Sequence, residues 1–170
     1  ILSSKHKKAR VAVLGCVAAL AVPAAVMAAD DDAIVIGNTS VIDTVDPVHN
    51  GSNAWSLTAD GVSETIFMQD KEGNLVSRIV DSIEQKDELT WEMKLKEGVK
   101  FSDGSDVDAQ ALCDSMNTIM ENNEMASTSA GVITFTPVDD MTVELKSERE
   151  TTVMPSVLCE YSMVVLKDTG

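Results

Sequence analysis

The sequence predicts an α/β fold, with strands and helices mixed around one core, and three features support this class. Residues 33–36 are apolar in succession, as in a short strand covered on both faces. Residues 90–95 alternate apolar and charged side chains, which is the pattern of a strand with one buried face. Residues 109–120 repeat apolar side chains at helical spacing, so this segment is expected to be a helix that packs on the strands.

The composition is that of a globular protein with an acidic body. Hydrophobic residues make up 44% of the 170-residue chain and charged residues 24%, which provides the apolar surface that a core needs. All 28 Asp and Glu residues follow position 28, where only 9 Lys and Arg residues remain, so the formal net charge of this part is −19. Such a charge repels phosphate backbones, and we expect no nucleic acid among the partners.

The first 28 residues have the three-part order of a signal peptide. Basic residues at positions 5–10 precede an apolar run over 11–22, and small side chains follow up to Ala28. The run is shorter than the roughly 20 residues of a transmembrane helix. We therefore expect cleavage after Ala28 or the next alanine, and a periplasmic or extracellular location. The alternatives are a retained membrane anchor and a lipoprotein processed at Cys16.

Turn residues divide the first half of the remaining chain into short elements. Asp46-Pro47, Asn50-Gly51 and Ser102-Asp103-Gly104 are turn signals, and residues 70–74 form a polar turn. The expected elements are a loop over 44–53, a helix over 55–67, a turn over 70–74, a helical turn over 77–81, and antiparallel strands over 90–95 and 99–101.

The second half continues the mixed pattern. Asp106 or Asp108 can cap the next helix, which runs to about Glu121, because a carboxylate accepts hydrogen bonds from the first free amides of a helix. Residues 161–166 are strongly apolar, and we expect the chain to be the N-terminal part of a longer protein. The other expected elements are a loop over 121–131, strands over 132–135 and 141–145, and a short helix over 154–158.

The exported part offers little catalytic or metal-binding chemistry. His49 is its single histidine, which excludes a pair of histidine ligands or a relay of two histidines. The aspartates within residues 103–108 lack the glycine and the later glutamate of a calcium loop, so we expect a solvated turn and a helix cap there. Cys113 and Cys159 could pair in an oxidising compartment, which the sequence leaves open. We expect no enzyme, no cofactor and no metal site.

The order of motifs resembles one family. Residues 89–104 read Leu-Thr-Trp-Glu-Met-Lys-Leu-Lys-Glu-Gly-Val-Lys-Phe-Ser-Asp-Gly, and this stretch is similar to the signature of family 5 of the extracellular solute-binding proteins. The resemblance covers residues 34–166. Two departures, Ile83 where the family usually has an aromatic residue and Ser105-Asp106 in place of Thr-Pro, concern the subfamily. Supporting matches lie in family order at 45–47, 64–67, 70–76 and 139–145.

The resemblance implies a fold of the periplasmic binding protein type II-like class, in which two lobes close on a solute. Residues 1–28 would be the signal peptide, and residues 29–170 the N-terminal part of the family 5 domain. About residues 33–56 would begin lobe I, and about residues 57–160 would form most of a smaller accessory domain. The second lobe would lie outside this chain.

The resemblance also implies a function, that of the substrate-binding component of an ABC transporter. Such a receptor captures peptides or similar small solutes outside the cytoplasmic membrane and delivers them to the permease and ATPase complex, and it is expected to be a monomer when full length. The alternatives are a nickel-chelate or glutathione receptor of the same family, and a secreted binding or chemosensory module without a role in transport.

By the same resemblance, the loop after Asp46-Pro47 and the first turn of the next helix approach the ligand. Amide and backbone groups there can hydrogen-bond a peptide, and Trp55 offers a flat apolar wall. A solvent-exposed turn and a tryptophan that only packs in the core are the structural alternatives. The candidate ligand-binding residues are Asn50, Gly51, Ser52, Asn53, Trp55 and, from a later segment, Tyr161.

Overall fold

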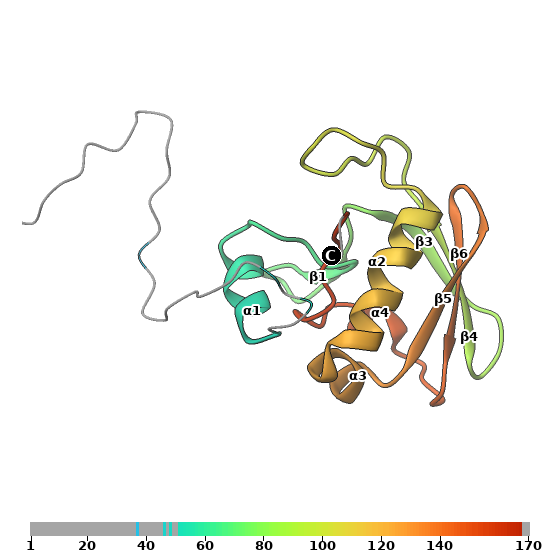
Figure 1. Ribbon diagram of the computed structural model, residues 1–170. Coiled ribbons are helices and arrows are strands. Elements are labelled where there is room, and N and C mark those ends of the chain that lie inside the picture. The colour runs from blue at the N-terminus through green and yellow to red at the C-terminus, as the bar shows by residue number, and fades with distance from the viewer. Residues whose placement is uncertain (1–36, 38–45, 47, 49–50, 168–170) are drawn as a thin grey trace, which may run out of the picture. The chain divides into compact units, whose positions relative to one another are not determined.

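The structure is a computed structural model that describes residues 37, 46, 48 and 51–167 (Figure 1). The chain divides into two compact units, and nearly all described residues belong to the second unit, Asn38–Gly170. The predicted signal peptide, the predicted strand at 33–36, Asn50 and His49 lie outside the described residues. The fold class is confirmed for the second unit, which contains both strands and helices.

A four-stranded antiparallel sheet forms the centre of this unit. The strand from the family signature lies inside the sheet, where Trp91 is opposite Leu145 and Met93 is opposite Val143 on the neighbouring strand. A separate two-stranded hairpin lies outside this sheet, in which Met68 and Gln69 pair with Val76 and Leu75. The sheet has the order β3 (Val80–Gln85), β4 (Thr90–Leu95), β6 (Thr142–Ser147), β5 (Ile133–Asp139), and the hairpin consists of β1 (Met68–Gln69) and β2 (Leu75–Val76).

Only one face of the four-stranded sheet is buried, as the alternation in the sequence predicts. The opposite face carries Glu84, Glu92 and Glu144 in one row across three adjacent strands. The ammonium nitrogen of Lys86 lies 3.0 Å from Glu84 and 3.1 Å from Glu92, which reduces the repulsion between these directly opposed carboxylates. The side chains that the inner face buries include Trp91, Met93, Leu95, Phe135, Val143 and Leu145.

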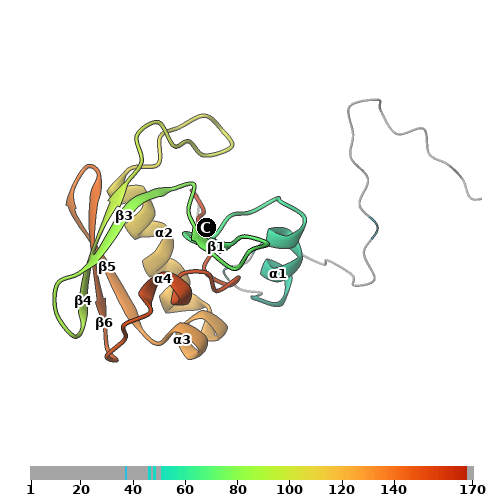
Figure 2. The same ribbon diagram turned by 180° about the vertical axis from the view of Figure 1, so that it is seen from behind.

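Helix α2 (Ala109–Asn122) covers the inner face, and Figures 1 and 2 show it along one side of the sheet. Asp108 caps its first turn by accepting a hydrogen bond from the amide of Ala111 at 2.8 Å, so the predicted cap is confirmed. Asn117 then ties the helix to the edge strand β5, because its amide group donates to the carbonyl of Phe135 and accepts from the Phe135 amide. Helix and sheet are therefore joined by polar contacts as well as by apolar packing.

Two connecting segments run side by side next to this core. Thr65 and Val164 form an antiparallel bridge, and the Val165 amide donates to the carbonyl of Glu64 at 2.9 Å. The Leu166 amide donates to the hydroxyl of Ser115 on α2 at 2.8 Å. The chain therefore enters the sheet region and leaves it at the same place. Helix α1 (Gly51–Ala59) precedes the first connection, and α4 (Met154–Val157) precedes the second.

The predicted helix over 55–67 is wrong in its extent. Helix α1 ends at Ala59, and Gly61 has a φ of +73°, a conformation that favours glycine and ends the helix. The following residues 64–67 lie in the extended connection, where Ile66 is fully buried. Val62, an apolar position of the predicted helix, is 70% exposed. Residues 161–167, the returning segment that follows helix α4, pair with this connection, and this pairing overrides the helical pattern.

Three other expected elements differ from the structure. The predicted strand at 99–101 does not join the sheet, because Gly98 turns the backbone with a φ of +75° and only an isolated bridge from Lys100 to Asp106 remains. The predicted helical turn at 77–81 is instead a bend that leads into β3, which begins at Val80. At this bend the Ser77 hydroxyl accepts hydrogen bonds from the amides of Ile79 and Val80. The predicted loop at 121–131 contains helix α3 (Glu124–Ala130). Within residues 51–167, no helix is long and apolar enough to cross a bilayer.

Candidate functional site

Helix α1 carries most of the predicted ligand-binding residues. Gly51, Ser52 and Asn53 form its first turn, so their backbone lies at the N-terminal end of a helix. Trp55 is 57% exposed, whereas the neighbouring Ala54 is fully buried. Packing of Trp55 in the core, one of the two alternatives drawn from the sequence, is therefore wrong. The indole instead offers an open apolar surface next to the first turn of the helix.

Tyr161 lies on the returning segment and contacts a residue that the sequence did not single out. Its hydroxyl donates to the thioether sulfur of Met125 in α3 at 3.1 Å. Asn123 positions Met125, because its side-chain oxygen caps α3 and accepts hydrogen bonds from the amides of Met125 and Ala126. A thioether is a weak acceptor, so the hydroxyl of Tyr161 remains available to a stronger acceptor such as a carbonyl or a carboxylate.

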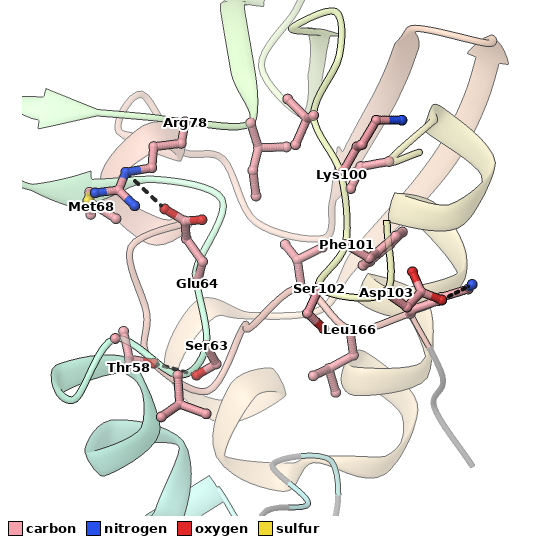
Figure 3. A pocket seen from close by; sticks show the side chains of 17 residues that line it. Thr58, Ser63, Glu64, Met68, Arg78, Lys100, Phe101, Ser102, Asp103 and Leu166 are labelled. Atoms are coloured by element: carbon pink, nitrogen blue, oxygen red, sulfur yellow. Dashed lines mark hydrogen bonds and ion pairs between the residues drawn. The ribbon is translucent and has the colours of Figure 1, made fainter. Parts of the chain in front are cut away.

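A pocket of about 610 Å³ opens beside the two connecting segments (Figure 3). Neither Trp55 nor Tyr161 lines it, although Thr58 of helix α1 does. Its walls come from the turn after α1, the segment before β3, the loop after β4, and the returning segment. The apolar part of the lining is Val62, Met68, Ile79, Val99, Phe101, Val107, Val165 and Leu166.

Charged side chains also line the pocket. Arg78 Nε lies 3.4 Å from Glu64 Oε1, and Lys167 forms an ion pair with Asp103. The pKa of Asp103 is lowered first by the ammonium group of Lys167 and then by the hydroxyl and amide of Ser105, which donate to the same carboxylate. Asp103 is therefore an anion across the physiological pH range.

The aspartates between residues 103 and 108 act as a turn and a helix cap, as the sequence predicts. Asp103 accepts from Ser105, Asp106 pairs with Lys100 at 2.5 Å, and Asp108 caps α2. Within the part of the chain that the structure describes, no group of three or more His, Cys, Asp or Glu side chains is placed to hold a metal ion.

The two cysteines of this part of the chain are free thiols in the structure. Cys113 belongs to the buried face of α2, and burial raises the pKa of its thiol to about 12. Burial also raises the pKa of Cys159. Both groups are therefore protonated at neutral pH, and neither is prepared to act as a nucleophile, because the thiolate is the reactive form.

Comparisons with known proteins agree with this architecture. The model of the family described as "Bacterial extracellular solute-binding proteins, family 5 Middle" matches residues 74–170. The glutathione-binding protein GsiB of Shigella dysenteriae is 33% identical over 108 residues, which are 63% of this chain and 20% of that protein. The periplasmic oligopeptide-binding protein OppA of Salmonella typhimurium is 30% identical over 102 residues, 60% of this chain and 19% of that protein.

Solved structures share the fold at lower identity. The nickel ABC transporter protein from Bacillus halodurans superposes with a TM-score of 0.66 and 20% identity, over 75% of this chain and 26% of that protein. OppA of Burkholderia pseudomallei gives a TM-score of 0.56 and 19% identity, over 72% of this chain and 28% of that protein. The chain thus spans about a fifth of the length of the curated relatives it matches.

Proposed function

We propose that this chain, which belongs to the family 5 bacterial extracellular solute-binding proteins, is the N-terminal part of the receptor of an ABC importer. The observation that carries this proposal is the family match over residues 74–170, because these residues build the sheet, helix α2 and the returning segment. Such a receptor works by binding alone. Closure around a solute is stabilised by contacts that form only in the closed state, and no catalytic group is needed.

The solute in this proposal is a peptide or a similar small molecule captured outside the cytoplasmic membrane. Relatives named for glutathione and for oligopeptides both match at 30–33% identity. These ligands share amide groups and carboxylates, which the hydroxyl of Tyr161 and the backbone amides at the start of α1 can bind. A nickel chelate is the second candidate, because a solved structure with the same fold belongs to a nickel transporter.

We assign the ligand-facing side of this chain to Asn50, Gly51, Ser52, Asn53, Trp55 and Tyr161. The open indole of Trp55 supports this assignment, since a large exposed aromatic group has an apolar surface to contribute to a partner. The weakly held hydroxyl of Tyr161 supports it as well. The rest of the binding site would come from the second lobe.

The domain limits follow from the same proposal. Residues 1–28 form a cleaved signal peptide, about 33–56 begin lobe I, and about 57–160 form most of the accessory domain. The paired connections at 64–67 and 163–166 support a boundary close to these limits, because an inserted domain enters and leaves its host at one place. The exported protein would deliver its solute as a monomer to a membrane permease with its ATPase.

The test is a binding screen on the complete mature gene product. Thermal unfolding is followed with peptide mixtures, glutathione and nickel chelates, and a ligand that binds only the folded state raises the unfolding temperature. Trp55→Ala should lower the affinity for the ligand that is found, by about tenfold for a lost aromatic contact of about 1.4 kcal/mol. Val138→Ala is the matched control, because Val138 is 58% exposed on strand β5.

If none of these solutes shifts the unfolding temperature, the transport assignment loses its support. If one does and Trp55→Ala binds it as tightly as the wild type, the receptor function stands and the assigned ligand-facing side is wrong.

A further inference from the structure

The pocket of Figure 3 differs in charge from the unit around it. Residues 51–167 contain 9 Lys and Arg against 22 Asp and Glu, a formal net charge of −13. The pocket lining contains three basic and two acidic side chains, a net charge of +1. The pocket is therefore a place where an anion meets less repulsion than on the rest of this surface. Its charged residues are Glu64, Arg78, Lys100, Asp103 and Lys167.

The three basic groups are not equally available to a ligand. Lys100 is paired with Asp106, and Lys167 is paired with Asp103. Arg78 approaches a carboxylate only through Nε, and its side chain is 77% exposed. In the described structure, the two terminal nitrogens of Arg78 have no protein partner. A guanidinium in this state can bind a carboxylate with two parallel N–H donors.

The carboxyl group of Glu64 is poorly satisfied in the same pocket. Its Oε1 is buried and accepts no hydrogen bond, although Arg78 Nε is 3.4 Å away. A buried carboxylate oxygen without a donor is costly. Glu64 also competes with any incoming anion for Arg78, so its charge should weaken anion binding at this place.

More of the pocket lining is apolar than charged. Ile79 and Val107 are buried, and Val99, Val165 and Leu166 pack against the core with part of their surface open. A volume of about 610 Å³ lies within the range of small-molecule sites in proteins. The pocket therefore combines space for an apolar group with a solvent-exposed guanidinium in its lining.

We propose that this pocket binds small organic carboxylates with an apolar body, and that Arg78 is the residue that binds the carboxylate. The site goes beyond the proposed receptor function, because it lies wholly within this chain and shares no residue with the ligand-facing side assigned to Trp55 and Tyr161. The apolar body contacts Ile79, Val99 and Leu166. Lys100 and Lys167 contribute only their positive field, since their ammonium groups are already paired.

The test uses ¹⁵N-labelled chain and two probes that differ in one charge, N-acetyl-leucine and its amide, N-acetyl-leucinamide. The carboxylate should give saturable shifts at the amides of Ile79, Val99 and Leu166, with the uncharged amide binding about tenfold more weakly, because a charge-assisted pair is roughly twice as strong as a neutral hydrogen bond. Raising the salt concentration should weaken the carboxylate more than the amide.

Two substitutions should move the affinity in opposite directions. Arg78→Gln should weaken N-acetyl-leucine about tenfold, and Glu64→Gln should strengthen it by a few fold because the competing charge is gone. Arg149→Gln is the control, since Arg149 is exposed and lies outside the pocket lining. Arg78 is largely exposed, so its replacement leaves the core intact.

The proposal is overturned if the two probes bind equally, or if Arg78→Gln and Arg149→Gln leave the same affinity. It is also overturned if the saturable shifts appear at Trp55 and Tyr161 and not around the pocket. That last result would leave the receptor function untouched, so the two proposals fail on different observations.

Discussion

The sheet with helix α2 is one region of this unit, and the two connecting segments beside it are another. Both regions contain fully buried side chains, but only the first shows a regular pattern of burial along the chain. In the sheet, Trp91, Met93 and Leu145 point to one face at every second position, and the buried face repeats along each strand. In the connections, Ile66 and Val164 are both fully buried, yet neither segment shows a repeat. Periodic burial is visible in a sequence, whereas burial that depends on one pairing of distant segments is not.

The largest expected effect lies in the sheet. Phe135→Ala removes a side chain that is 2% exposed and leaves a cavity between β5 and α2, which should lower the free energy of unfolding by about 3–5 kcal/mol. Thr136→Ala, one position along the same strand on the exposed face, should change it by less than about 0.5 kcal/mol. Urea unfolding of the two variants measures the difference, and similar losses would contradict the one-sided burial of the sheet.

The same contrast explains what could be predicted from the sequence. The strand at 90–95, the helix capped by Asp108 and the strand at 141–145 were predictable, because each shows a regular repeat next to a turn or a cap. The helix expected up to residue 67 failed where the chain passes Gly61 and pairs with the returning segment. The local spacing of apolar residues does not reveal that Thr65 pairs with Val164, almost a hundred residues later in the chain.

The candidate site shows the same limit. The family resemblance pointed to Trp55 and Tyr161 as ligand-facing residues. Whether Trp55 is exposed or packs in the core could not be decided from the sequence. The contact between Tyr161 and Met125 was not predictable, since it joins α3 to the returning segment. Arg78 gave no signal either, because only the folded chain brings it beside Glu64 in the lining of a pocket.

A smaller effect is expected where the returning segment meets α2. Ser115 is 1% exposed, and its hydroxyl accepts a hydrogen bond from the Leu166 amide. Ser115→Ala leaves that amide without a partner and should cost about 1–3 kcal/mol. In this variant, the rate of amide hydrogen exchange should increase more at Leu166 and Val165 than in the sheet. Ser129→Ala, the same change at an exposed position of α3, should leave both exchange rates unchanged.

If Ser115→Ala accelerates exchange equally in β4 and at Leu166, the connections and the sheet unfold as one unit. The distinction between the two regions would then concern only how their burial is encoded, and not how stable each of them is.

The smallest expected effect concerns the ion pair between Asp103 and Lys167, which joins the loop after β4 to the returning segment. The pKa of Asp103 is lowered in the folded chain, so its contribution to stability is present above the unfolded value of about 3.9 and is lost as the pH falls through the folded value. Lys167→Met should raise the pKa of Asp103 toward its ordinary value, although Ser105 still donates two hydrogen bonds to the carboxylate. A carbon-detected NMR titration of the Asp103 carboxyl group measures this change.

Salt separates this ion pair from the hydrogen bonds around it. Both charged side chains are about half exposed, so high salt should screen the attraction and move the pKa of wild-type Asp103 toward that of Lys167→Met. The contribution of Ser105 should persist, because short-range hydrogen bonds are less sensitive to screening. If Lys167→Met leaves the titration of Asp103 unchanged, the ammonium group does not hold the returning segment to the loop. The backbone pairing at Thr65 and Val164 would then be the contact that fixes this connection.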